Sequence, residues 1–81
     1  MVPAEELRFS GHALRQMARR RISRTEVGDA LANPEATYPS AERPERTVVL
    51  GSAASGRRLK VVVTGTRPTV VITAADRDQV P

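Results

Sequence analysis

The fold of this chain is decided by residues 47–73, which read TVVLGSAASGRRLKVVVTGTRPTVVIT. Three apolar, valine-rich runs of strand length lie in this stretch, at Thr47–Leu50, Leu59–Thr64 and Thr69–Thr73. The connections between them are short and contain glycine, serine or proline. Because parallel neighbours need a crossover of about a dozen residues or more, runs joined this closely must pair antiparallel. The stretch therefore predicts an antiparallel β-meander.

Side chains alternate between the two faces of each predicted strand. In the middle run, Leu59, Val61 and Val63 share one face, whereas Lys60 and Val62 share the other. One layer of helices covers only one face, so we expect the Lys60 face to be partly exposed. The alternative is that this second face is buried in a homodimer, because the strands are apolar on both sides.

Two helices are predicted before this sheet. The first runs from Ser10, which is placed as its N-cap, to about Arg20. On a helical wheel its inward face holds Leu14, Met17 and Ala18, with Ala13 at its margin. Its outward face holds His12, Arg15, Gln16 and Arg19. This helix is therefore expected to be amphipathic with a cationic outer surface.

The second helix is marked at both of its ends. Ser23-Arg24-Thr25-Glu26 matches a capping box, and the helix is expected from about Arg24 to Ala32. Pro34 ends it, since proline disfavours a helical conformation of the residue before it. The join between the helices is short enough for a helical hairpin. We therefore expect an α+β domain in which an N-terminal helical hairpin packs on one face of a three- to four-stranded antiparallel sheet, with an edge strand around Ala36–Tyr38.

Length and charge narrow the class of protein. A chain of 81 residues holds one domain, spanning residues 1–81. The formal net charge is +4, and the basic residues are arginines with the single exception of Lys60. Guanidinium groups match phosphate and carboxylate oxygens, so this composition favours a nucleic acid or an acidic protein as partner. A GC-rich genome, whose codon usage encodes arginine in place of lysine, would explain the same composition.

The sequence predicts neither a metal nor a cofactor. It has no cysteine and one histidine, so it offers no disulfide framework and no zinc centre, and we expect a cytoplasmic location. Met1–Leu7 is polar and acidic, unlike a secretory signal. No apolar run approaches the ~20 residues of a membrane span, so no membrane partner is expected.

Three motifs support a resemblance to a known family. Residues 9–23 read FSGHALRQMARRRIS, residues 56–63 read GRRLKVVV and residues 71–74 read VITA. They resemble the F-S-x-H-A-x-x-R/Q-M-x-x-R-x-I-S opening and two strand motifs of a bacterial family of domains of unknown function. In this chain, Gln16 stands where that family often has arginine and Arg21 where it often has glycine.

That family is similar to the BrnT and RelE/ParE toxin superfamily. The resemblance implies a RelE/BrnT-like fold, in which a helical hairpin packs on a curved antiparallel sheet. It also implies a messenger-RNA endonuclease, acting on free RNA or on the ribosome, that pairs with an antitoxin protein.

Metal-free RNA cleavage must activate the 2′-hydroxyl, stabilise the phosphorane and protonate the leaving 5′-oxygen. We single out His12, Arg57 and Lys60 as candidate catalytic residues. His12 would act as base or acid beside Arg20. The alternative is a structural role, in which His12 hydrogen-bonds a loop carbonyl or the sheet edge. The phosphorane would be stabilised by Arg57, Arg58 and Lys60. The alternative is that these basic side chains protect an edge strand from wrong pairing.

Five arginines are the candidate RNA-binding residues, namely Arg15, Arg19, Arg20, Arg58 and Arg77. The cations at the end of the first helix are also explained by the helix dipole. Arg77 lies in Asp76-Arg77-Asp78, which is equally a polar tail.

The predicted function is therefore a toxin-type, metal-independent endoribonuclease. The first alternative is a non-catalytic module on the same fold that binds nucleic acid or protein. The second is a ParE-like inhibitor of a topoisomerase. Phe9 and Tyr38 are the two aromatic residues, which counts against recognition of unpaired bases by stacking.

Overall fold

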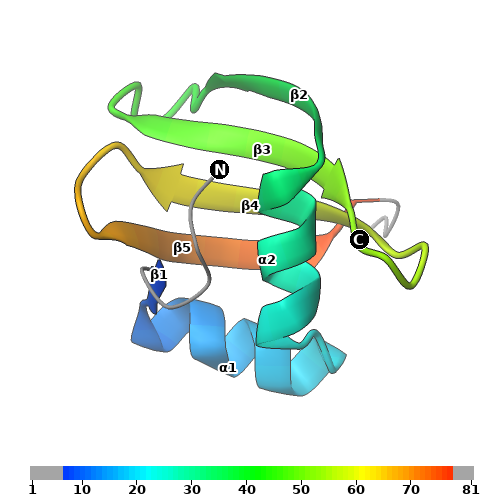
Figure 1. The fold of residues 1–81 in the computed structure, drawn as a ribbon. Helices are drawn as coiled ribbons and strands as arrows, with labels where there is room; N and C mark the ends of the chain where they lie inside the picture. Colours follow the sequence, from blue (N-terminus) through cyan, green and yellow to red (C-terminus); the bar gives the residue numbers. More distant parts are fainter. Residues whose placement is uncertain (1–6, 78–81) are drawn as a thin grey trace.

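The computed structural model describes residues 7–77, which form one sheet and two helices (Figure 1). The strands are β1 (Leu7–Phe9), β2 (Pro34–Pro39), β3 (Arg46–Ser52), β4 (Arg58–Thr64) and β5 (Thr69–Asp76). The helices are α1 (Gly11–Arg20) and α2 (Arg24–Ala32). The spatial order of the strands is β1-β5-β4-β3-β2.

The meander predicted from residues 47–73 is confirmed, since β3 pairs antiparallel with β4 and β4 with β5. The edge strand around Ala36–Tyr38 is also present and extends to Pro34–Pro39. At the other edge, β1 pairs parallel with β5, so that Leu7 lies beside Thr69. The sheet is therefore mixed and has five strands.

The expected fold class was wrong in two respects. The sheet is neither purely antiparallel nor limited to four strands, because Leu7–Phe9, for which no strand was predicted, form the parallel strand β1. The helices do not form a hairpin either. In Figure 1, α2 runs across the direction of α1, and the two helices pack on different strands, α1 on β5 and α2 on β3 and β4. Each helix buries its apolar side chains against the sheet, and neither uses the other as its main packing partner.

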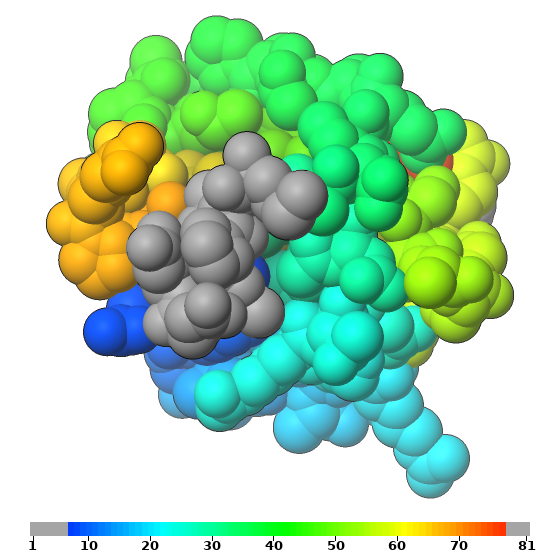
Figure 2. Space-filling view, viewed as in Figure 1, coloured from blue at the N-terminus to red at the C-terminus, as the bar shows by residue number. Residues whose placement is uncertain are grey.

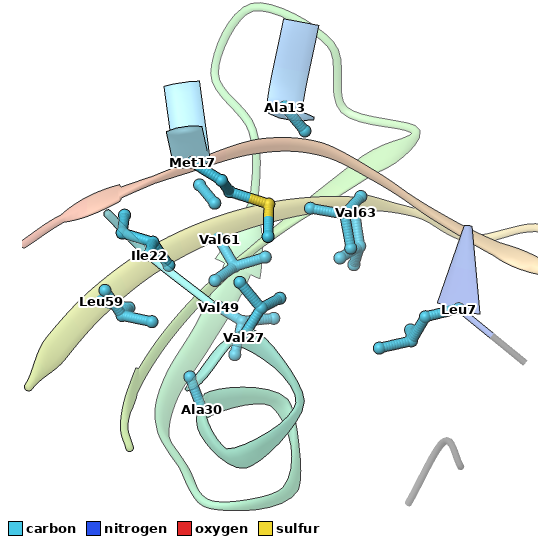
Figure 3. Packing of buried hydrophobic residues seen from close by; sticks show 12 residues of the cluster. Leu7, Ala13, Met17, Ile22, Val27, Ala30, Val49, Leu59, Val61 and Val63 are labelled. Carbon is cyan, nitrogen blue, oxygen red and sulfur yellow. The ribbon is translucent and has the colours of Figure 1, made fainter. Parts of the chain in front are cut away.

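Both helices contribute to one hydrophobic core on a single side of the sheet (Figure 3). Its buried side chains are Leu7, Ala13, Met17, Ile22, Val27, Ala30, Val49, Leu59, Val61, Val63, Val71 and Ala74. The predicted inward face of β4 is thus confirmed, and Lys60 on the opposite face is exposed. No helix within residues 7–77 is long and apolar enough to cross a membrane.

Helix α1 is rotated relative to the expected wheel. Ala13 and Met17 are buried, whereas Leu14 is 38% exposed and Ala18 is also exposed. Gln16, expected on the outer surface, is half-buried and its Oε1 accepts a hydrogen bond from the Ala74 amide at 3.2 Å. The expected inward face was wrong because the helical wheel considers apolarity alone. A backbone amide of β5 takes its hydrogen-bond acceptor from α1, and this turns Gln16 toward the sheet.

The caps of both helices agree with the sequence. Ser10 caps α1 by accepting from the Ala13 amide at 3.0 Å, and Ser23 and Glu26 form the complete capping box of α2. Ser10 also donates through its amide to the Val71 carbonyl and through its hydroxyl to the Ile72 carbonyl. After β1 ends at Phe9, the start of α1 therefore continues to cover the backbone edge of β5.

Candidate functional site

The side chain of Arg57 lies at the junction of several elements, on the helix side of the sheet. Its Nε and Nη2 donate to the two carboxylate oxygens of Asp76 at 2.5 and 3.0 Å. Nη1 donates to the Arg21 carbonyl at 2.8 Å and to Glu26 at 3.4 Å, and Nη2 also donates to the Arg20 carbonyl at 2.7 Å.

These contacts use all five N–H donors of the guanidinium group. The ion pair with Asp76 raises the pKa of Arg57, and the hydrogen bond from Arg57 holds the pKa of Asp76 below its usual value. The pKa of Glu26 is lowered as well, chiefly by its hydrogen bond from the Ser23 amide. Arg57 therefore joins the end of α1, the start of α2 and the end of β5, and it has no donor left for a phosphate in this arrangement.

The loop between β3 and β4 is held against α2 on the same side (Figure 2, yellow-green beside the α2 atoms). The Ala54 amide donates to Asp29 at 3.1 Å, and the Ser55 hydroxyl donates to Glu26 at 3.1 Å. Together with Arg57, these bonds mark this region as a structural junction.

The predicted residues of α1 lie apart from Lys60, because they belong to the helix layer. His12, Arg15 and Arg19 are exposed, and the structure gives His12 no hydrogen bond to any residue between 7 and 77. Arg20 is half-buried, and its charge contributes to the lowered pKa of Asp76. His12 was expected to act beside Arg20, and Gln16, which lies between them on α1, turns toward β5.

Alternation along β4 separates the remaining candidates. Arg57 precedes Leu59 by two positions and shares its side of the sheet, whereas Arg58 and Lys60 point to the opposite, outer face. The structure therefore does not bring together His12, Arg57 and Lys60, the three residues predicted to be catalytic. It places Lys60 in a different site, on the face that carries neither helix.

Lys60 lines a groove of about 500 Å³ on this outer face. The strand residues around it are Tyr38 of β2, Arg46 and Val48 of β3, Lys60 and Val62 of β4, and Thr73 of β5. The connection between β2 and β3 completes the rim with Ser40, Ala41, Glu42 and Arg43. The groove thus has a floor of two valines. Three cations, one carboxylate and three hydroxyls lie around it.

A second group of charges extends the same face toward the end of β5. Glu35 accepts from Arg77 through a short ion pair and from the Ser52 hydroxyl at 3.1 Å. The hydrogen bond from Arg77 is the largest cause of the lowered pKa of Glu35, and the charge of Arg58 adds to it. Two predicted RNA-binding residues, Arg58 and Arg77, are therefore neighbours of one carboxylate.

Sequence reasoning missed Arg43, Arg46 and Glu42 as parts of a site. Outside the predicted edge strand around Ala36–Tyr38, residues 35–45 carry no hydrophobic period from which to place their side chains. Arg46 could have been found, because it has the same parity as Val48 on a strand that pairs with β4. Among residues 7–77 there is no group of three or more histidine, cysteine, aspartate or glutamate side chains placed to hold a metal ion.

Comparison with known proteins identifies the family. The model of a family described as a domain of unknown function, DUF4258, matches residues 9–76, and the chain belongs to this family. No curated protein matches the chain, and no solved structure does.

Proposed function

We propose that this DUF4258 protein binds RNA on the outer face of its sheet and cleaves it there as a metal-independent endoribonuclease of the toxin type. The observation that carries the proposal is the convergence of Lys60, Arg43 and Arg46 around one groove. Of the residues predicted to be catalytic, Lys60 retains a catalytic role, whereas Arg57 has a structural one. Such an activity belongs in the cytoplasm, with messenger RNA as substrate.

Electrostatics favour a phosphate in this groove. Three cations against the single carboxylate Glu42 leave a local excess of positive charge. Arg58 is exposed on the same face, so a nucleic-acid backbone that leaves the groove meets a further cation. Contacts of this kind bind phosphate without regard to base, which suits a chain with few aromatic residues.

The groove also holds groups suited to each step of the reaction. Glu42 would accept the proton of the 2′-hydroxyl as its oxygen attacks the adjacent phosphorus. Arg43, Arg46 and Lys60 would stabilise the charge that develops on the phosphorane. The Tyr38 hydroxyl would give its proton to the 5′-oxygen as the phosphorus–oxygen bond breaks. The products would be a 2′,3′-cyclic phosphate and a free 5′-hydroxyl.

The choice of reaction class rests on the similarity expected between this family and the BrnT and RelE/ParE toxins. Under this proposal the protein has an antitoxin partner that suppresses its activity. The non-catalytic alternative uses the same groove and the same cations and differs only in the absence of cleavage.

Labelled single-stranded RNA, incubated with the protein in the presence of EDTA, tests the proposal. We expect cleavage that stops when the nucleotide 5′ to the cut carries a 2′-deoxyribose. Lys60→Ala and Arg46→Ala should abolish cutting. Each should also weaken RNA binding and reduce the slope of log Kd against log salt concentration by about one. Arg15→Ala, a cation on the exposed side of α1, is the matched control and should cut like the parent protein.

Two results separate the alternatives. Binding that depends on Lys60 and Arg46 without cleavage, both on free RNA and with ribosomes, would establish the non-catalytic module. RNA binding that is equally strong in the Lys60→Ala, Arg46→Ala and parent proteins would remove the groove as the site.

A further inference from the structure

Strand β2 forms an edge of the sheet whose backbone groups face away from the rest of the domain. It is the last strand in the spatial order, and β3 is its only strand partner among residues 7–77. All six residues from Pro34 to Pro39 are exposed. Edge strands of this kind offer unpaired N–H and C=O groups to another strand.

The register shows which groups point outward. The Ser40 amide donates to the Arg46 carbonyl at 2.9 Å, so this pair lies at a hydrogen-bonded position of the antiparallel ladder. Hydrogen-bonded positions recur at every second residue, so the backbone N–H and C=O groups of Tyr38 and Ala36 also point toward β3. The backbone groups of Thr37 and Pro39 point away from β3. Pro39 fits this assignment, because its missing N–H falls on the outward side.

Thr37 is therefore the central outward-facing residue of the strand, with both an amide and a carbonyl to offer. The prolines at the two ends of β2 limit any added strand to a short segment around it. Glu35 is the one charged side chain in β2, and Arg77 already neutralises it. A second β2 strand would thus meet no uncompensated like charge along the ladder.

We propose that β2 pairs antiparallel with β2 of a second copy of this chain, about a two-fold axis that passes beside Thr37. Each Thr37 donates its amide to the carbonyl of the other copy's Thr37, and threonine beside threonine is a favourable cross-strand pair. The pairing is self-complementary, as an isologous interface requires. Tyr38, which is 44% exposed, lies opposite the small Ala36 of the other copy.

The pairing joins the two five-stranded sheets into one continuous sheet. An antiparallel pair about a two-fold axis perpendicular to the sheet keeps the same face of both sheets on one side. The two grooves around Lys60 therefore open on a common basic face, with β2 of each copy between them. The dimer itself does not depend on the proposed function.

The variant Thr37→Pro tests the dimer, because it removes the outward N–H while leaving the bonds between β2 and β3 in place. Light scattering on a size-exclusion column should give the mass of a dimer for the parent protein and half that mass for Thr37→Pro. Thr37→Val keeps the amide and removes only the hydroxyl, so this matched control should stay dimeric. A parent protein that is monomeric at millimolar concentration would overturn the proposal, and so would a folded Thr37→Pro protein that remains dimeric.

A second measurement does not depend on how well the proline variant folds. The chain has no cysteine, so Thr37→Cys introduces a unique thiol. Directly opposed residues at a hydrogen-bonded position have Cα atoms about 5.5 Å apart, which a disulfide can bridge. Mild oxidation should cross-link Thr37→Cys rapidly and leave Arg15→Cys, on the exposed side of α1, mostly monomeric. Equal cross-linking of the two variants would contradict the interface.

Discussion

Arg21 shows how a single residue turns the chain between the two helices. It adopts a left-handed conformation with φ 56° and ψ 45°, and its amide donates to the Ala18 carbonyl while that of Ile22 donates to Met17. This is the Schellman arrangement in which glycine is the usual residue. A left-handed conformation costs a residue with a Cβ atom about 1 kcal/mol or more.

Arg21→Gly removes this conformational cost, and we therefore expect it to raise the free energy of unfolding by about 1 kcal/mol. The greater freedom of glycine in the unfolded chain offsets part of this gain. Chemical denaturation at neutral pH measures the change. Arg21→Ala removes the same charge and retains the Cβ atom, so it should bring no such gain. An equal gain in both variants would assign the effect to the charge.

At the scale of elements, the contact between α2 and β3 depends on Gly51. A Cβ atom at this position would lie 2.2 Å from the Ala30 carbonyl oxygen and 2.8 Å from its carbonyl carbon. Both are backbone atoms of the helix, so α2 would have to move away from the sheet. Gly51→Ala should therefore lower the free energy of unfolding by about 3 kcal/mol, as overpacking of a core does.

The control for Gly51 lies in the same helix–strand unit. A Cβ atom at Gly28 of α2 has no neighbour within 4 Å, and alanine favours a helix interior by about 1 kcal/mol over glycine. Gly28→Ala should stabilise the protein, and thermal unfolding of the two variants should shift in opposite directions. A Gly51→Ala protein as stable as the parent would show that α2 does not need this close approach.

For the whole molecule, the network around Arg57 links elements that are distant in sequence and makes stability depend on pH. The pKa values of Asp76 and Glu26 are lower in the folded protein than in the unfolded chain. Their contribution to stability is therefore complete above the unfolded pKa values, at about pH 4 to 4.5, and is lost as the pH falls through the lower folded values. Urea denaturation between pH 7 and pH 3 should show this loss.

Asp76→Asn provides the comparison. It should be less stable than the parent protein at pH 7 by about 2 kcal/mol, since a hydrogen-bonded charge is replaced by an amide. Its stability should then fall less steeply with acid, so that the two curves approach one another at pH 3. Parallel curves would show that the Asp76 carboxylate does not contribute to the acid dependence.

Much of this fold could be predicted from the sequence, because it depends on neighbours in the chain. The bounds of α2, both N-caps and the β3-β4-β5 meander follow from capping patterns and strand alternation. The outward position of Lys60 follows from the same alternation. Of the residues that line the groove, however, Lys60 alone is among the predicted catalytic and RNA-binding residues.

The sequence by itself determined both helices, the strands β2 to β5 and which face of β4 is buried. Local hydrogen bonds and side-chain periodicity decide those features within a few residues. The tertiary structure alone decided that β1 joins β5 in parallel, that the helices pack on different strands, and that Arg57 is enclosed by Asp76 and Glu26. It also decided that Arg43 and Arg46 stand beside Lys60. Each of these contacts joins residues far apart in the chain, and their geometry depends on how the layers pack, which no local pattern records.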